Sequence, residues 1–265
     1  MIKKNTLWSS LVMMMVTMLS ISIVSCGDDE EEIIPNPVID GHEAVDLGLP
    51  SGTLWATRNI GAYGVYDRGK FFQWGEITSI NNDENVNWNS NYKPGNVVYT
   101  GTSSAACGTE SDVMYVDNII NQDAMGNWIG SIAGNSKYDA ATVNWGGSWK
   151  MPTKAQMDEL ISKCTWTYTN SDVDGVFSGY TVTGKNGNSI FLPLGGYRHY
   201  MNLDRGSSCG CYWSATVCQN SAAKAYYLTF EINAVSGNAN VNQEDRIYGF
   251  NIRPVSNDTS YKNKN

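Results

Sequence analysis

The chain has 265 residues, a formal net charge of −8, and 42% hydrophobic and 11% aromatic residues. Nine tryptophans, 15 tyrosines and 26 glycines are typical of a folded, loop-rich β-type domain, which excludes a disordered chain and a helical bundle. The negative balance argues against nucleic acid and anionic lipid surfaces as partners.

The first 25 residues have the form of a bacterial secretory signal. Lys3 and Lys4 form a basic start, and residues 7–24 form an apolar run interrupted by serine and threonine. The run ends in Ile23-Val24-Ser25-Cys26, which resembles the lipobox of bacterial lipoproteins. We therefore expect cleavage before Cys26 and lipidation of that cysteine. An uncleaved membrane helix is the alternative, because the run just reaches the ~18 residues that can span a bilayer.

An acidic linker is predicted over residues 26–37. Five adjacent carboxylates repel one another, which favours a solvated tether over a folded element. They are Asp28, Asp29, Glu30, Glu31 and Glu32. Their place directly after a lipidated cysteine is similar to the export signal of Bacteroidota surface lipoproteins. A plain spacer between the lipid and the domain is the alternative.

A single domain is predicted over residues 38–255, followed by a polar tail over 256–265. Short runs bounded by turn residues predict strands. In chain order they are Val45–Leu49, Thr53–Thr57, Phe71–Trp74, Gly179–Thr183, Ser189–Pro193, Tyr212–Thr216, Ala225–Ile232 and Tyr248–Val255. Asn186-Gly187 predicts a tight hairpin. Residues 77–139 lack a strong period and are expected to form a variable surface insertion.

One well-defined helix is predicted over about residues 153–164. Thr153 is followed three residues later by Gln156, which is the pattern of a capping box. Asp139–Thr142 is expected to form a helical turn before it. Four apolar residues of the helix share one face at helical spacing: Met157, Leu160, Ile161 and Cys164.

Six segments in order carry a family resemblance. They are LGLPSGTLWAT (47–57), FFQWGE (71–76), DAATVNWGGSWKMPT (139–153), NSIFLPLGGYR (188–198), YWSAT (212–216) and YGFNIRPV (248–255). Together they look like the Fibrobacter succinogenes major paralogous domain, which is common in secreted and surface proteins of Bacteroidota. That family is similar to the C-type-lectin-like fold of formylglycine-generating enzymes. The resemblance implies an α+β domain with small antiparallel sheets, one well-defined helix, long loops and adjoining chain ends.

The resemblance to formylglycine-generating enzymes does not extend to their catalytic residues. A formylglycine-type oxidase needs its paired copper-binding cysteines and a segment rich in Asn and Glu, and no such segment occurs here. Cys209, Cys211 and Cys218 could join His199 as soft-metal ligands, but their spacing fits no standard zinc pattern. His42, the other histidine, is expected in the linker zone. We therefore expect no catalytic residue, no metal and no cofactor.

Five cysteines remain if Cys26 is acylated, so at least one thiol is left over in a compartment that permits disulfides. They are Cys107, Cys164, Cys209, Cys211 and Cys218. Cys164 lies on the apolar face of the predicted helix and is expected to be the buried free thiol. The other four could form two bridges or stay reduced.

Aromatic and polar side chains on loops are the candidates for recognition. One group follows the family motif: His199, Tyr200 and Asp204. A second group lies in the variable insertion and includes Trp88, Tyr92 and Trp128. Framework roles are expected for the residues of the family motifs: Tyr197, Arg198, Trp55, Trp74, Trp145, Trp149 and Trp213.

The sequence thus predicts a non-catalytic, surface-exposed lipoprotein, held in the outer membrane by its lipid anchor. Its expected partner is an extracellular glycan or protein, bound in the manner of an adhesin. A structural or assembly partner of a surface complex is the first alternative. A divergent metal oxidase of the formylglycine-generating type is the second.

Overall fold

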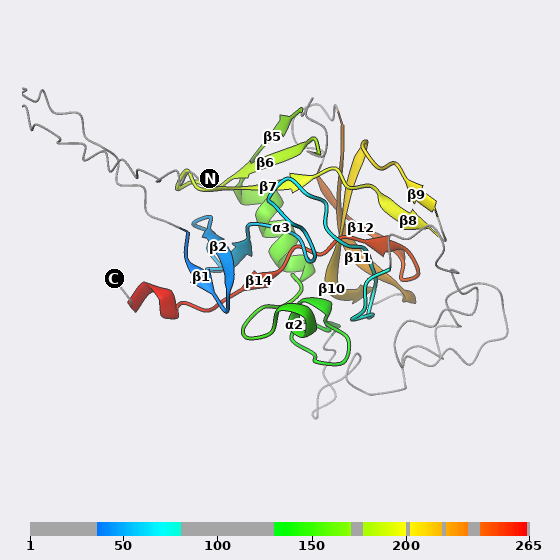
Figure 1. Ribbon diagram of the computed structural model, residues 1–265, viewed down its shortest axis with the longest axis horizontal. Helices are drawn as coiled ribbons and strands as arrows, with labels where there is room; N and C mark the ends of the chain where they lie inside the picture. Colours follow the sequence, from blue (N-terminus) through cyan, green and yellow to red (C-terminus); the bar gives the residue numbers. More distant parts are fainter. Residues whose placement is uncertain are drawn as a thin grey trace, which may run out of the picture. The chain divides into compact units, whose positions relative to one another are not determined.

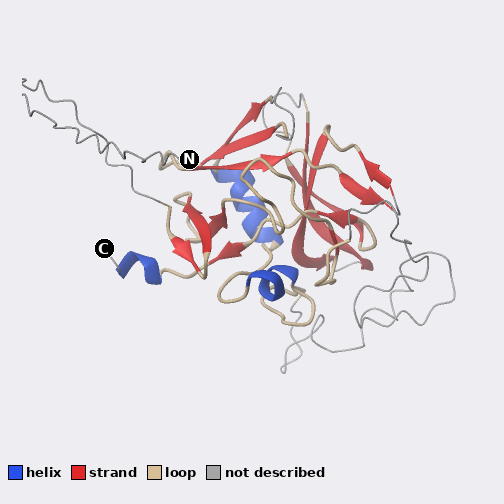
Figure 2. Cartoon of the chain, in the orientation of Figure 1, coloured by secondary structure: helices blue, strands red, loops and turns tan. Residues whose placement is uncertain are grey.

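The computed structural model describes residues 36–80, 130–170, 177–199, 202–218, 221–232 and 239–263 (Figure 1). Residues Asn36–Asn265 form one compact unit. Within the described ranges the strands form four sheets, each joined by antiparallel pairs, with two α-helices among them (Figure 2). This is a mainly β arrangement of the α+β or mostly β class. None of the described helices has the length and apolar character needed to cross a membrane.

The first sheet joins strands from both ends of the described chain in the order β1-β2-β3-β14. Its strands are β1 (Val38–Ile39), β2 (His42–Asp46), β3 (Leu54–Ala56) and β14 (Val255–Ser256).

The pairing of β3 with β14 joins the first part of the domain to its last strand. Val255 lies opposite Trp55, and Ser256 lies opposite Leu54. The pairing brings the two ends of the domain together, as the resemblance implied (Figure 1). The expected polar tail continues from this strand into the short 3-10 helix η1, Ser260–Asn263.

The second sheet is a meander of β5 (Thr165–Thr169), β6 (Gly179–Thr183) and β7 (Ser189–Pro193). β6 and β7 have the predicted bounds. The turn between them contains Gly187, whose φ of 86° lies in the left-handed region that glycine tolerates. β5 is not among the predicted strands, and its pairing with β6 gives it an edge position.

The third sheet contains the longest strands, in the order β10-β11-β12. β10 is Cys209–Cys218, β11 is Ser221–Glu231 and β12 is Asn240–Asp245. β10 extends the strand predicted over 212–216 at both ends, and β11 begins four residues before the strand predicted over 225–232 and ends one residue before its end. β12 is polar, and the sequence pattern does not predict it.

The fourth sheet has the order β4-β13-β8-β9. Its strands are β4 (Phe72–Gln73), β13 (Gly249–Phe250), β8 (Tyr197–His199) and β9 (Asn202–Asp204). The prediction of a single strand over Tyr248–Val255 is wrong, because the chain leaves this sheet after Phe250 and joins the first sheet at Val255.

The predicted helix is confirmed as α3, Lys154–Lys163. Thr153 N–H donates to Gln156 Oε1 at 2.9 Å, and Gln156 N–H donates to Thr153 Oγ1 at 3.3 Å, which completes the capping box. Met157 and Leu160 are buried. Cys164 ends the helix in an extended conformation and is only partly buried, so the expectation that it is the buried thiol is wrong.

The predicted helical turn is the start of α2, Ala140–Trp145, which Asp139 caps. The structure describes residues 77–80 and 130–139 of the expected surface insertion, and the second range includes the buried side chains of Ile132, Tyr138 and Asp139. This end of the insertion therefore belongs to the core. Its polar composition had indicated a position on the surface.

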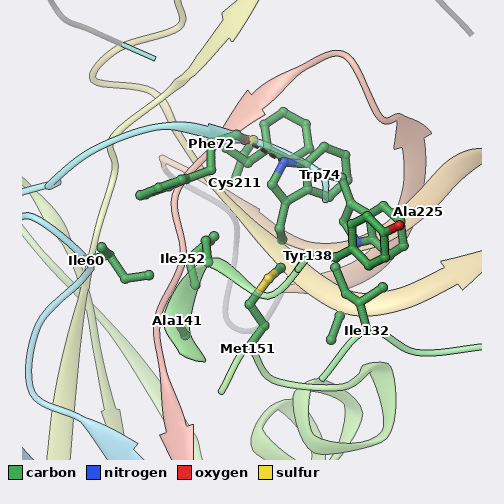
Figure 3. Packing of buried hydrophobic residues seen from close by; sticks show 14 of the residues in the cluster. Ile60, Phe72, Trp74, Ile132, Tyr138, Ala141, Met151, Cys211, Ala225 and Ile252 are labelled. Carbon is green, nitrogen blue, oxygen red and sulfur yellow. Dashed lines mark hydrogen bonds between the residues drawn. The ribbon is translucent and has the colours of Figure 1, made fainter. Parts of the chain in front are cut away.

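Two large apolar clusters fill the domain. In the first, Met151 from the segment before α3 lies among Trp74, Tyr138 and Ile132 (Figure 3). The second packs α3 against the meander and the other face of the third sheet. Of the tryptophans expected in the core, Trp145 is partly buried and four are fully buried: Trp55, Trp74, Trp149 and Trp213.

His42 lies in β2, so the expectation that it belongs to a linker zone is wrong. Its ring stacks on Trp145 with centroids 3.8 Å apart and an interplanar angle of 4°. Strand structure therefore begins before the first predicted strand, and His42 serves packing at this position.

Candidate functional site

A pocket of about 260 Å³ lies between the third and fourth sheets. The third sheet contributes side chains from all three of its strands, and the fourth contributes β8 and β13. The lining of the pocket includes Tyr197, Arg205, Cys209, Glu231, Asn242 and Tyr248.

Side chains alternate between the two faces of each strand in the third sheet, which explains why these side chains meet. Residues two apart in a strand point to the same face. Cys209 and Cys211 lie opposite Glu231 and Thr229 in the register of β10 and β11. Tyr227 lies opposite Asn242 in the register of β11 and β12. Thiol, hydroxyl, carboxylate and amide groups on one face of the sheet therefore point into the pocket.

Aromatic rings form the other wall. Phe250 of β13 lies with its ring centroid 4.7 Å from that of Tyr227 and 6.1 Å from that of Tyr197. Tyr248 packs edge-on against Tyr197 at 5.7 Å. Such ring edges and faces offer a rigid apolar surface, while the tyrosine hydroxyls keep polar character in the pocket.

An ion pair stands at the rim of the pocket. Arg205 Nη1 donates to Glu231 Oε1 at 2.8 Å, and the two side chains are 45% and 55% exposed. The hydrogen bond from the guanidinium lowers the pKa of Glu231. Arg205 has a φ of 52°, a conformation that costs an ordinary residue about 1–3 kcal/mol and often marks functional sites.

The four described cysteines are all free thiols: Cys164, Cys209, Cys211 and Cys218. Two of them reach the pocket, with Cys209 Sγ and Cys211 Sγ 3.8 Å apart. A hydrogen bond from Cys211 and the charge of Arg205 lower the pKa of Cys209, although burial opposes them. The same bond and burial raise the pKa of Cys211.

Two of the predicted recognition residues border this pocket without lining it. The ring of His199 stacks on Tyr248 with centroids 4.4 Å apart. Asp204 lies opposite Tyr197 in the β8–β9 register. Burial and then the charge of Asp204 raise the pKa of Tyr197. Tyr197, which the sequence assigns to the framework, lines the pocket itself.

The other predicted functional residues lie outside the described ranges: Tyr200, Trp88, Tyr92, Trp128, Cys26, Asp28, Asp29, Glu30, Glu31 and Glu32. Cys107 lies outside them as well. Their proposed roles stay predictions.

Sequence reasoning missed the contribution of β11 and β12 to the pocket. The signal was the alternation within β11, where Tyr227, Thr229 and Glu231 are separated by the apolar residues Leu228 and Phe230. That pattern indicates a strand with one buried face and one face toward a site.

A second hollow of about 610 Å³ lies along the loop from Gly61 to Lys70, beside Phe177. Tyr63 is 97% exposed there, and Tyr66 is 48% exposed. This hollow has exposed aromatic rings but fewer converging polar groups than the first pocket.

No group of three or more metal-ligating His, Cys, Asp or Glu side chains occurs within the described ranges. No protein-family model, curated protein or solved structure matches the chain.

Proposed function

We propose that the protein is a non-catalytic binding protein and that the pocket between the third and fourth sheets takes one ring of an extracellular saccharide. The combination of tyrosine rings with hydrogen-bonding groups carries this proposal. The pocket volume of about 260 Å³ is just below the roughly 300–1,000 Å³ of sites for drug-sized ligands, which suits a single ring.

The polar groups match what a sugar hydroxyl needs. Glu231 and Glu244 supply acceptors, Arg205 supplies donors, and Asn242 supplies both. Tyrosine rings supply the apolar surface of the pocket. A hydroxylated ring with an apolar face would satisfy both kinds of group.

The wider setting belongs to the same proposal. The lipobox-like segment before Cys26 and the acidic run from Asp28 to Glu32 support a lipid-anchored, surface-exposed outer-membrane protein. The six family segments support a C-type-lectin-like fold for the domain. Replacing Cys26 by Ala should release the protein from membranes, and retention would reject lipidation at this residue.

A glycan array probed with the full chain tests the binding role. We expect a bound glycan whose signal falls several-fold in Asn242→Ala, because one lost hydrogen bond costs about 0.5–1.5 kcal/mol. Gln243→Ala is the matched control, since Gln243 follows Asn242 in β12 and its side chain points to the other face of the strand. A blank array, or equal binding by both variants, would overturn the proposal.

The assembly role is the second candidate. The exposed rings of Tyr63 and Tyr66 favour it, because tyrosine is enriched in protein interfaces. Tyr63→Ala should weaken co-purification of a stable partner from intact cells and leave glycan binding unchanged. Loss of glycan binding in this variant would instead assign the glycan to the second hollow.

A further inference from the structure

We propose that Cys209 and Cys211 form a redox-active dithiol in the pocket, which exchanges with small disulfides that enter it. The inference does not depend on the proposed saccharide. Three observations carry it: the spacing of the two sulfurs, their access through the pocket, and the charged group beside them.

The two side chains share one face of β10 because they are two residues apart. Their sulfurs are 3.8 Å apart, and Gly210 between them lies against the ring of Phe230 on the other face. A strand rises about 3.2–3.4 Å per residue, so the Cα atoms are roughly 6.4–6.8 Å apart. This Cα separation lies at the upper end of the range that a disulfide can bridge. The two Cβ atoms point the same way and must approach to about 3.5–4.5 Å, so the bridge forms with a local bend of β10.

The burial of Cys209 and Cys211 limits which disulfides can reach their sulfurs. Cys209 and Cys211 are only 2% and 4% exposed, and both line the pocket. Small disulfides can therefore reach the sulfurs, while a folded protein cannot.

Cys209 is the attacking thiol. The hydrogen bond from Cys211 and the charge of the nearby Arg205 favour its thiolate, against burial and the charge of Glu231, and Cys211 keeps its proton. The other two described thiols are weaker nucleophiles: burial raises the pKa of Cys164 and of Cys218 to about 11. Neither of them lines this pocket.

The reaction balances as two exchanges. The Cys209 thiolate attacks a disulfide RSSR, forms a mixed disulfide with one RS group and releases the other as a thiolate. Cys211 then loses its proton and attacks the Cys209 sulfur, which releases the second RS group. The protein loses two protons and two electrons, and RSSR takes them up to become two RSH.

Cys209 and Cys211 are less suited to binding a metal ion than to forming a disulfide. Two thiolates 3.8 Å apart could share a soft cation, but structural zinc needs four ligands. The described ranges hold no third metal-ligating side chain in a group with them.

Hydroxyethyl disulfide, a small uncharged reagent, tests the proposal when it is added to the full chain and peptides are mapped by mass without reduction. We expect a Cys209–Cys211 bridge to form at least ~10-fold faster than the reagent adds to Cys164 or Cys218, because each unit of pKa changes the thiolate fraction tenfold. Cys211→Ser should trap the hydroxyethyl thiol on Cys209. Cys209→Ser should leave Cys211 unmodified.

Several results would overturn the proposal. One is that Cys164 and Cys218 react as fast as Cys209. Another is that Cys209 shows no mass change in the folded protein while it reacts in the urea-unfolded chain. A third is a bridge from Cys209 to Cys107. Circular dichroism of each serine variant checks that it folds, and glycan binding measured in parallel keeps this test separate from the proposed function.

Discussion

Replacing Asp139 by Ala tests how α2 and the segment before α3 are held together. The buried carboxylate accepts hydrogen bonds from Ala141 N at 2.8 Å and Thr142 N at 3.0 Å, which caps α2. It also accepts from Gly134 N at 2.7 Å and Met151 N at 3.0 Å. One side chain thus satisfies donors from three parts of the chain.

The expected loss of stability is about 3 kcal/mol. Removal of the cap costs about 1 kcal/mol. Met151 is buried, so its unsatisfied N–H adds about 2 kcal/mol, whereas the exposed Gly134 can bond to water. Asp139→Asn keeps one acceptor oxygen and should cost less.

Urea unfolding of the full chain, followed by tryptophan fluorescence, measures this difference. A loss below about 1 kcal/mol for Asp139→Ala would refute the reasoning, because even the cap alone accounts for that amount.

The same side chain gives a pH signature. Burial raises the pKa of Asp139 above 3.8, despite the N–H donors that lower it. The folded state therefore holds its proton to higher pH than the unfolded chain, and stability from this group falls as pH rises from about 3.8 through the folded pKa. Asp139→Asn should remove that slope.

Three further substitutions test other contacts. Thr153→Ala should cost about 1 kcal/mol in urea unfolding, because it removes half of the capping box; no change would reject the cap. Gly210→Ala should cost about 1–3 kcal/mol, since its Cβ would clash with the ring of Phe230; neutral behaviour would show that the ring can move. Arg253→Met should lower the melting temperature by several degrees, because it leaves the buried acceptor Asn59 Oδ1 without the hydrogen bond that Arg253 Nε donates at 2.7 Å. An unchanged melting temperature would contradict this.

Local signals explain the elements that are predicted correctly. The α3 capping box acts over three residues, and the Asn186-Gly187 turn fixes the β6–β7 hairpin through adjacent residues. Both elements therefore have the expected bounds. Distant contacts add to these local signals, since Gln156 Nε2 donates to Thr53 Oγ1 and Asn186 Nδ2 donates to the carbonyl of Asp46.

Long-range pairing explains the rest. β12 reads NVNQED and has no apolar period, so it becomes a strand only because β11 pairs with it. The segment 251–254 is held away from the fourth sheet by contacts with distant parts of the chain, since Arg253 donates to the carbonyls of Ala56 and Phe191. The pocket draws on both sheets, so no single stretch of sequence could reveal it.

Fluorine NMR of the full chain with fluorotyrosine, titrated with the glycan bound best on the array, tests the central claim most directly. Tyr-to-Phe variants assign the signals. The proposed site predicts shifts at Tyr197, Tyr227 and Tyr248 and none at the exposed Tyr63. Shifts confined to Tyr63 and Tyr66 would contradict it.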